Sequence, residues 1–274
     1  MFVSIHFPLT TSKTHKHLVV YLPDDYYTTD KRYPVLYIND GQNAFFDQQS
    51  YAGISWGFEE YVKKENIPVI MVAVPCIFDD EGRMNEYGPW PINQAMSYAH
   101  TQEPGKIIGG KGKAYIDDLI NELVPYINRR FRTDDAHNAM IGSSMGGVIT
   151  AYACLAHPEV FPYGAALSTA FWFYRDEFRQ LILDTDVSRL KGFYFDFGGF
   201  EDANEEINHL YETSNHEIFD LLKDKIASLG FYYFEEATHN EESWRTRMAY
   251  FMPVVLGQKR EAIEYVQDGV IRFR

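Results

Sequence analysis

Apolar residues in this chain form short continuous runs, separated by longer segments with helical periodicity. Runs such as 34–39 and 68–74 are almost entirely apolar and do not alternate, which is typical of strands buried on both faces of a parallel sheet. Helical spacing appears over 116–127, where Pro125 predicts a kink. The predicted strands are 3–7, 17–22, 34–39, 68–74, 137–141, 165–168, 192–197 and 231–235, and the predicted helices are 56–64, 116–127, 148–156, 206–229 and one that starts near 241. This alternation predicts an α/β fold with a doubly wound, largely parallel central sheet and helices on both faces.

The length favours one domain over the whole of residues 1–274. The chain is 46% hydrophobic, which is enough for one sizeable core, and it shows no internal repeat or low-complexity linker. Residues 76–112 form a long polar and aromatic stretch, and loops of that length inside a compact domain are usually functional. The tail 258–274 offers either a short strand or a contact between subunits of a homo-oligomer.

Net charge, targeting segments and metal-ligand patterns limit the kinds of partner that this chain is expected to have. The formal net charge of −14 repels phosphate backbones, so nucleic acid is not an expected partner. The first residues lack a basic region followed by a long apolar run, and no segment approaches a membrane span, so we expect a cytoplasmic protein with no membrane contact. Neither cysteine lies in a metal-binding pattern, and His15 and His17 fit a polar strand face better than a metal pair. We therefore expect no metal and no cofactor.

The clearest chemical signal is a G-x-S-x-G pattern over residues 142–146, with Ser144 at its centre. A short buried strand precedes the pattern and an apolar helix follows it, which is the context the motif requires. Small residues on both sides let the strand and the helix approach closely, and the tight turn exposes the serine hydroxyl. Ser144 is therefore the predicted nucleophile.

A serine nucleophile needs a general base, and His239 is the best candidate. It follows the predicted strand 231–235 and precedes a helix, so it lies on a loop at the carboxyl end of a strand, where active sites of parallel sheets assemble. The alternative is a loop histidine that helps to start the helix. His209 and His216 fall inside a predicted helix, which makes them poorer candidates.

The acid that orients the base is expected one strand earlier, in the loop after 192–197. Glu201 and Asp202 both stand there, and we favour Glu201 while Asp202 remains the alternative. Acidic residues also favour helix N-termini, so the alternative for both residues is that they stabilise the start of the following helix. Asp196 lies within the strand and is less able to reach the histidine.

Two backbone N–H groups are expected to form an oxyanion hole. One belongs to Met145, the residue after the nucleophile. The other is assigned to Gln42, in the Asp-Gly-Gln-Asn segment after the strand 34–39, where Gly41 permits a tight turn. An ordinary Asp-Gly turn is the alternative.

Aromatic residues near the predicted strand ends are candidates to line a substrate pocket. Each of them alone is more often a packing residue than a substrate contact. The candidates are Tyr87, Trp90, Phe171, Trp172 and Phe200.

Four segments together resemble the esterase D and enterochelin-esterase-like branch of the α/β-hydrolases. They are 36–43, 83–87, 142–147 and 236–244, within a resemblance that spans about residues 13–256. It implies an α/β-hydrolase fold, Ser144 as nucleophile, His239 as base, and an acid from the loop after the strand 192–197. Relatives often carry Gly-Thr-x-Glu or Gly-Thr-x-Asp in that loop, whereas this chain has Gly198-Gly199-Phe200-Glu201.

These features predict a serine carboxylesterase that hydrolyses a small-molecule acyl ester through an acyl-enzyme. The resemblance implies substrates among acetyl or feruloyl esters of sugars, siderophore lactones and S-formylglutathione. The missing secretion signal favours a small acyl ester over an extracellular polysaccharide. Two alternatives remain open: an acyltransferase on the same fold, and a non-catalytic binding protein that retains it.

Overall fold

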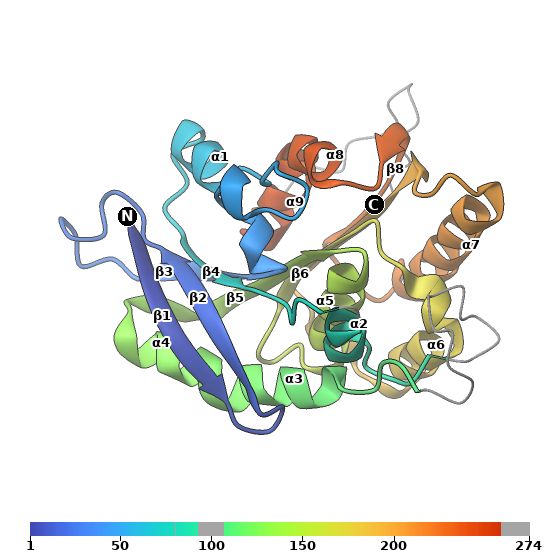
Figure 1. Cartoon of the computed structure of the whole chain (residues 1–274), viewed down its shortest axis with the longest axis horizontal. Helices are drawn as coiled ribbons and strands as arrows, with labels where there is room; N and C mark the ends of the chain where they lie inside the picture. The colour runs from blue at the N-terminus through green and yellow to red at the C-terminus, as the bar shows by residue number, and fades with distance from the viewer. Residues whose placement is uncertain (80, 93–106, 259–274) are drawn as a thin grey trace.

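A single eight-stranded sheet runs through the molecule (Figure 1). The computed structural model describes residues 1–79, 81–92 and 107–258. The strand order is β1-β2-β4-β3-β5-β6-β7-β8; β1 and β2 pair antiparallel, β2 joins β4 antiparallel, and all later pairs are parallel. The strands are β1 (Phe2–Leu9), β2 (Thr14–Tyr21), β3 (Tyr33–Asn39), β4 (Ile70–Val74), β5 (Thr133–Ser143), β6 (Tyr163–Leu167), β7 (Gly192–Phe200) and β8 (Leu229–Thr238).

Helices cover both faces of the sheet and divide the core in two. One apolar cluster lies against α1, α8 and α9, and the larger one lies against α2 to α7 (Figure 1). The predicted α/β-hydrolase architecture is confirmed. The helices are α1 (Phe58–Lys64), α2 (Gly82–Tyr87), α3 (Gly112–Asp118), α4 (Val124–Arg130), α5 (Met145–Ala156), α6 (Arg175–Asp184), α7 (Glu205–Leu222), α8 (Glu241–Thr246) and α9 (Met248–Val255).

The helical segment around Pro125 differs from the prediction. It begins at Gly112 and consists of α3, a π-helical turn over Leu119–Leu123 (η4), and α4. Pro125 stands in the first turn of α4, where its missing N–H removes no bond that a regular α-helix would need at its start. The wider π turn therefore accommodates the proline between two α-helical pieces.

Two further boundaries of the prediction were wrong. The helix expected over 56–64 starts at Phe58, because Gly57 takes a left-handed conformation (φ 69°) and acts as the N-cap. The helix expected over 206–229 ends at Leu222, and β8 begins at Leu229. The tail from residue 259 and much of the long loop, residues 93–106, lie outside the described residues. Within the described part, no helix has the length and apolar character needed to cross a membrane.

Candidate active site

Ser144 occupies the sharp turn between β5 and α5. Its backbone angles are φ 57° and ψ −123°, a region that non-glycine residues rarely adopt. The turn is held by a hydrogen bond from the Ser144 N–H to the Leu167 carbonyl of β6 (2.9 Å). A Cβ on Gly142 would come within 2.3 Å of the Gly146 carbonyl oxygen, so the crossing of β5 and α5 requires glycine there. The half-buried Ser144 thus sits on the strained strand-to-helix turn that the motif predicts.

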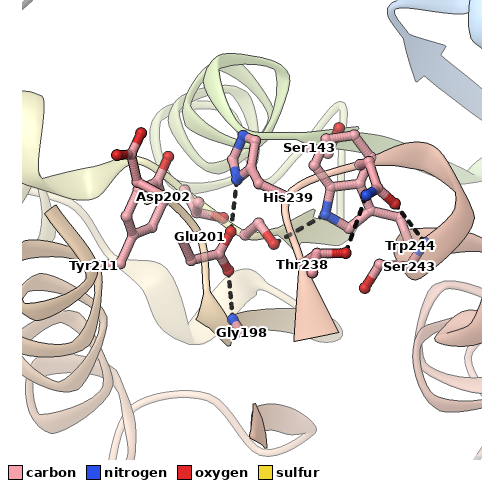
Figure 2. A network of polar contacts seen from close by, with 12 residues as sticks. Ser143, Gly198, Glu201, Asp202, Tyr211, Thr238, His239, Ser243 and Trp244 are labelled. Atoms are coloured by element: carbon pink, nitrogen blue, oxygen red, sulfur yellow. Dashed lines mark hydrogen bonds and ion pairs between the residues drawn. The ribbon is translucent and has the colours of Figure 1, made fainter. Parts of the chain in front are cut away.

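His239 lies on the short loop between β8 and α8, at the carboxyl end of the sheet. Its ring nitrogen Nδ1 is 2.5 Å from Glu201 Oε2, and Figure 2 shows this contact together with the backbone N–H of Gly198 on the other carboxylate oxygen. The Asn240 side chain caps α8 by accepting from the Ser243 N–H (3.0 Å), which fixes the loop after the histidine. The Nδ1 contact leaves Nε2 as the ring nitrogen available for proton transfer.

The two acidic candidates have different surroundings. The Glu201 side chain is fully buried (0% exposed), whereas His239 is 25% exposed. Asp202 is exposed, and its carboxylate accepts from the Asn204 N–H (2.8 Å) just before α7. The structure therefore brings Glu201 to the histidine, while Asp202 organises the start of a helix.

Asp196 belongs to a buried network of its own. Its carboxylate binds Arg247 (2.7 Å) and accepts from the Tyr194 hydroxyl (2.6 Å) and the Ser168 N–H (2.8 Å). Burial raises the pKa of Asp196, and the charge of Arg247 opposes that rise. Because its carboxylate is bound by Arg247, Tyr194 and Ser168, Asp196 does not act as the partner of His239.

Trp244 connects that network to His239. Its indole Nε1 donates to Ser168 Oγ (2.9 Å), and its ring packs edge-on against His239 at a centroid distance of 5.1 Å. Sequence reasoning did not assign this role, although Trp244 belongs to one of the resembling segments.

The proposed oxyanion loop is built differently from the prediction. The left-handed conformation falls on Asp40 (φ 51°), not on Gly41. Glycine is required at 41 because an added Cβ would lie 2.3 Å from the Val74 nitrogen of β4. Gln42 is half-buried, and its side-chain oxygen accepts from the Cys76 N–H (3.3 Å). Met145 is the first residue of α5, where N–H groups have no partner within the helix.

Arg83 fastens this loop from α2. Its guanidinium donates two hydrogen bonds to the Asp40 carboxylate, both 2.8 Å long. On the same helix Tyr87 accepts a hydrogen bond from the Asp40 N–H (2.8 Å), and Glu86 pairs with the buried Lys16 (2.5 Å). The segment 83–87 is therefore a clamp that holds Asp40 next to the nucleophile turn.

The loop that carries Gln42 and the loop that carries His239 are joined directly. Asn43 Nδ2 donates to Glu241 Oε1 (2.8 Å), and both residues are buried. Burial raises the pKa of Glu241, and the negative charge of Asp40 adds to the rise. Two segments that resemble the same family at opposite ends of the chain thus meet side chain to side chain.

The predicted pocket aromatics occupy different positions. Tyr87 is fully buried within the clamp, and half-buried Trp90 packs against Tyr152 and Phe178 of α5 and α6. Trp172 is 5% exposed and stacks on Phe173, whereas Phe200 is 56% exposed at the end of β7.

Tyr211 was not singled out from the sequence, yet it lies beside the candidate triad. This residue of α7 packs edge-on against His239 at 5.7 Å, and its hydroxyl interacts with the Ser144 side chain. Its position in the middle of a helix gave no pattern that would have identified it.

The remaining reactive side chains have ordinary surroundings. Burial raises the pKa of Cys76 to about 12, so this thiol stays neutral and is not a nucleophile at physiological pH. Cys154 is buried in α5, as expected. His15 and His17 are exposed on β2, and among the described residues no group of three or more His, Cys, Asp or Glu is arranged to hold a metal ion.

A largely parallel sheet with a serine at positive φ between β5 and α5 defines the α/β-hydrolase class. The chain belongs to the family described as putative esterase, whose model matches residues 10–253. Its solved structural neighbours share the fold of this chain.

Individual relatives are distant. The uncharacterised protein YbbA of Bacillus subtilis is 26% identical over 162 residues, which cover 58% of this chain and 58% of YbbA. An endo-1,4-beta-xylanase/feruloyl esterase of Xylanibacter ruminicola is 30% identical over 155 residues, 54% of this chain but only 19% of that protein. The crystal structure of an IroE-like serine hydrolase from Shewanella oneidensis has a TM-score of 0.68 at 19% identity and covers 90% of this chain and 79% of its own. The alignments with the first two relatives thus span less than two thirds of their lengths.

Proposed function

We propose that the protein is a serine carboxylesterase that hydrolyses a small-molecule acyl ester, with Ser144, His239 and Glu201 as its catalytic triad. The observation that carries the proposal is the 2.5 Å contact between His239 Nδ1 and the buried Glu201 carboxylate, next to a serine on a strained turn. A carboxylate on Nδ1 holds the imidazole in the tautomer that accepts a proton at Nε2.

In the proposed reaction, His239 Nε2 removes the proton from Ser144 as Oγ attacks the ester carbonyl carbon. The N–H groups of Gln42 and Met145 stabilise the oxyanion that forms, an interaction often worth about 3 kcal/mol per donor. The imidazolium, stabilised by Glu201, then gives its proton to the departing alcohol. Water, activated by the same histidine, hydrolyses the acyl-enzyme.

A matched pair of serine variants tests the proposal. We expect Ser144→Ala to abolish hydrolysis of p-nitrophenyl acetate, because the attacking oxygen is removed. Ser143→Ala is the control, since Ser143 is buried one residue earlier and Ser144 provides the nucleophile. Labelling with a fluorophosphonate probe should be lost only in the first variant. Activity retained by a folded Ser144→Ala protein would refute the assignment.

The same assay separates hydrolysis from acyl transfer. Products are analysed with and without added alcohol acceptors, and an esterase is expected to release free acid as its main product in both cases. A new ester as the dominant product at low acceptor concentration would identify the protein as an acyltransferase instead.

A further inference from the structure

Tyr211 places a phenol hydroxyl at the candidate triad without being part of it. The residue projects from α7, is 5% exposed, and lies near Glu201 in Figure 2. Its ring contacts His239 at a centroid distance of 5.7 Å and Trp172 at 6.1 Å, both in edge-to-face geometry. These contacts from α8's loop and from the segment after β6 hold the phenol in one orientation.

The surroundings of the Tyr211 hydroxyl indicate how its proton is used. Burial and the charge of Glu201 raise the pKa of Tyr211, so the phenol stays protonated in the working pH range. The Ser144 and Trp172 side chains oppose that rise, which places the phenol hydroxyl close to both of them. A protonated phenol carries one O–H donor, which can serve an acceptor that enters the site.

Trp172 supplies the second observation. Its indole Nε1 is buried and has no hydrogen-bond partner among the described residues, although Trp172 is close enough to the Tyr211 hydroxyl to lower its pKa. A buried N–H without a partner is costly. A small shift of the Tyr211 hydroxyl when a substrate binds would satisfy the indole and orient the phenol proton.

The side of the site on which Tyr211 lies identifies the acceptor. The oxyanion loop comes from β3, on one side of the nucleophile strand β5. Tyr211, Trp172 and His239 come from the elements around β6, β7 and β8, on the other side. The oxygen of the departing alcohol must face His239, since His239 protonates it. Tyr211 therefore stands beside the leaving oxygen and away from the oxyanion.

We propose that Tyr211 donates a hydrogen bond to the leaving alkoxy oxygen and that Trp172 positions the phenol for it. The inference rests on the proposed esterase function. As the tetrahedral intermediate collapses, the bond from carbon to the alkoxy oxygen breaks and its electron pair stays on that oxygen. The oxygen takes the proton of His239 Nε2, while Tyr211 keeps its own proton and stabilises the developing charge. This arrangement favours esters of alkyl alcohols, whose oxygens carry most charge when they depart.

The test compares leaving groups in the full-length protein. The quantity measured is kcat/KM for ethyl acetate and for p-nitrophenyl acetate, because it reports the steps up to loss of the alcohol. Nitrophenolate leaves without assistance, whereas ethoxide does not. We expect Tyr211→Phe to lower the ratio of the ethyl to the nitrophenyl value by about 10- to 100-fold, the effect of one hydrogen bond to a charged group. Trp172→Phe should lower the ratio less, in the same direction.

Tyr174→Phe is the matched control. It removes the same hydroxyl from a buried tyrosine two residues after Trp172, and that hydroxyl lies beside Gly88 and Gly109. The ratio should not change. Equal loss on both esters in Tyr211→Phe would overturn the inference alone and indicate a role in the fold or at the oxyanion. A wild-type protein that hydrolyses neither ester and takes no fluorophosphonate label would instead overturn the proposed function, and the inference with it.

Discussion

Glu201→Gln is the sharpest test of the triad, since it removes one charge and leaves the shape of the side chain. The carboxylate is fully buried and 2.5 Å from His239 Nδ1. When Nε2 takes the serine proton, a positive imidazolium forms against this group, and an amide cannot compensate its charge. If the amide N–H₂ faces Nδ1, it favours the tautomer with a bare Nδ1 and the proton on Nε2, and that tautomer cannot accept the serine proton at Nε2. We expect kcat to fall by about 10⁴-fold, or about 5 kcal/mol in the barrier.

The assay is hydrolysis of p-nitrophenyl acetate at saturating substrate, with the melting temperature measured in parallel. Asp202→Asn is the charge-matched neighbour: its carboxylate is exposed and caps the approach to α7, so we expect kcat within about threefold of the wild type. The reasoning is refuted if Glu201→Gln keeps more than a tenth of the wild-type kcat, or if Asp202→Asn loses as much.

Two further predictions concern stability. The folded protein raises the pKa of Glu241 above its ordinary value of 4.5, so it binds that proton more tightly than the unfolded chain, and the stability contribution is lost as pH rises through the folded pKa. In thermal melts, the melting temperature of Glu241→Gln relative to that of the wild type should therefore be higher at pH 8 than at pH 4. The opposite trend would contradict the raised pKa. Arg83→Met leaves the nearly buried Asp40 carboxylate without its two hydrogen bonds, and because Arg83 is itself about one-third exposed we expect a loss of about 2 kcal/mol in urea unfolding. Adding Asp40→Asn should recover part of that loss, because it removes the unpaired charge. A double variant no more stable than Arg83→Met would show that the Arg83–Asp40 ion pair is not the cause of the loss.

The fold was predictable because its strands carry continuous apolar runs, and the serine turn because glycine spacing there is a steric requirement. The loop position of His239 also followed from local pattern, since β8 ends at Thr238 and α8 begins at Glu241. The choice between Glu201 and Asp202 did not follow from local pattern, because adjacent carboxylates in a loop differ only in which side chain turns inward. That direction is set by the Gly198 N–H and by the histidine itself.

Contacts between distant segments were beyond the sequence for a similar reason. The segment 83–87 resembled a family pattern, but its clamp on Asp40 depends on how α2 packs beside the nucleophile turn. Tyr211 sits on an amphipathic helix like many tyrosines, and only tertiary placement brings it to Ser144. The helix boundary at Gly57 and the π turn before Pro125 likewise depended on backbone conformations that periodicity does not encode.

The Asn43–Glu241 bond has a consequence for how such a site diversifies. It ties the loop that would hold the oxyanion to the helix that follows the base, so a change in either is felt by the other. The aromatic segment after β6 packs instead against α7, where Asn215 donates to the Thr169 carbonyl (3.0 Å). The site is thus assembled from two separately anchored parts: the loops joined by Asn43 and Glu241, and the aromatic segment that packs against α7. We expect relatives to accept esters of other alcohols and acids through substitutions in the aromatic segment after β6. The loops joined by Asn43 and Glu241 should stay unchanged.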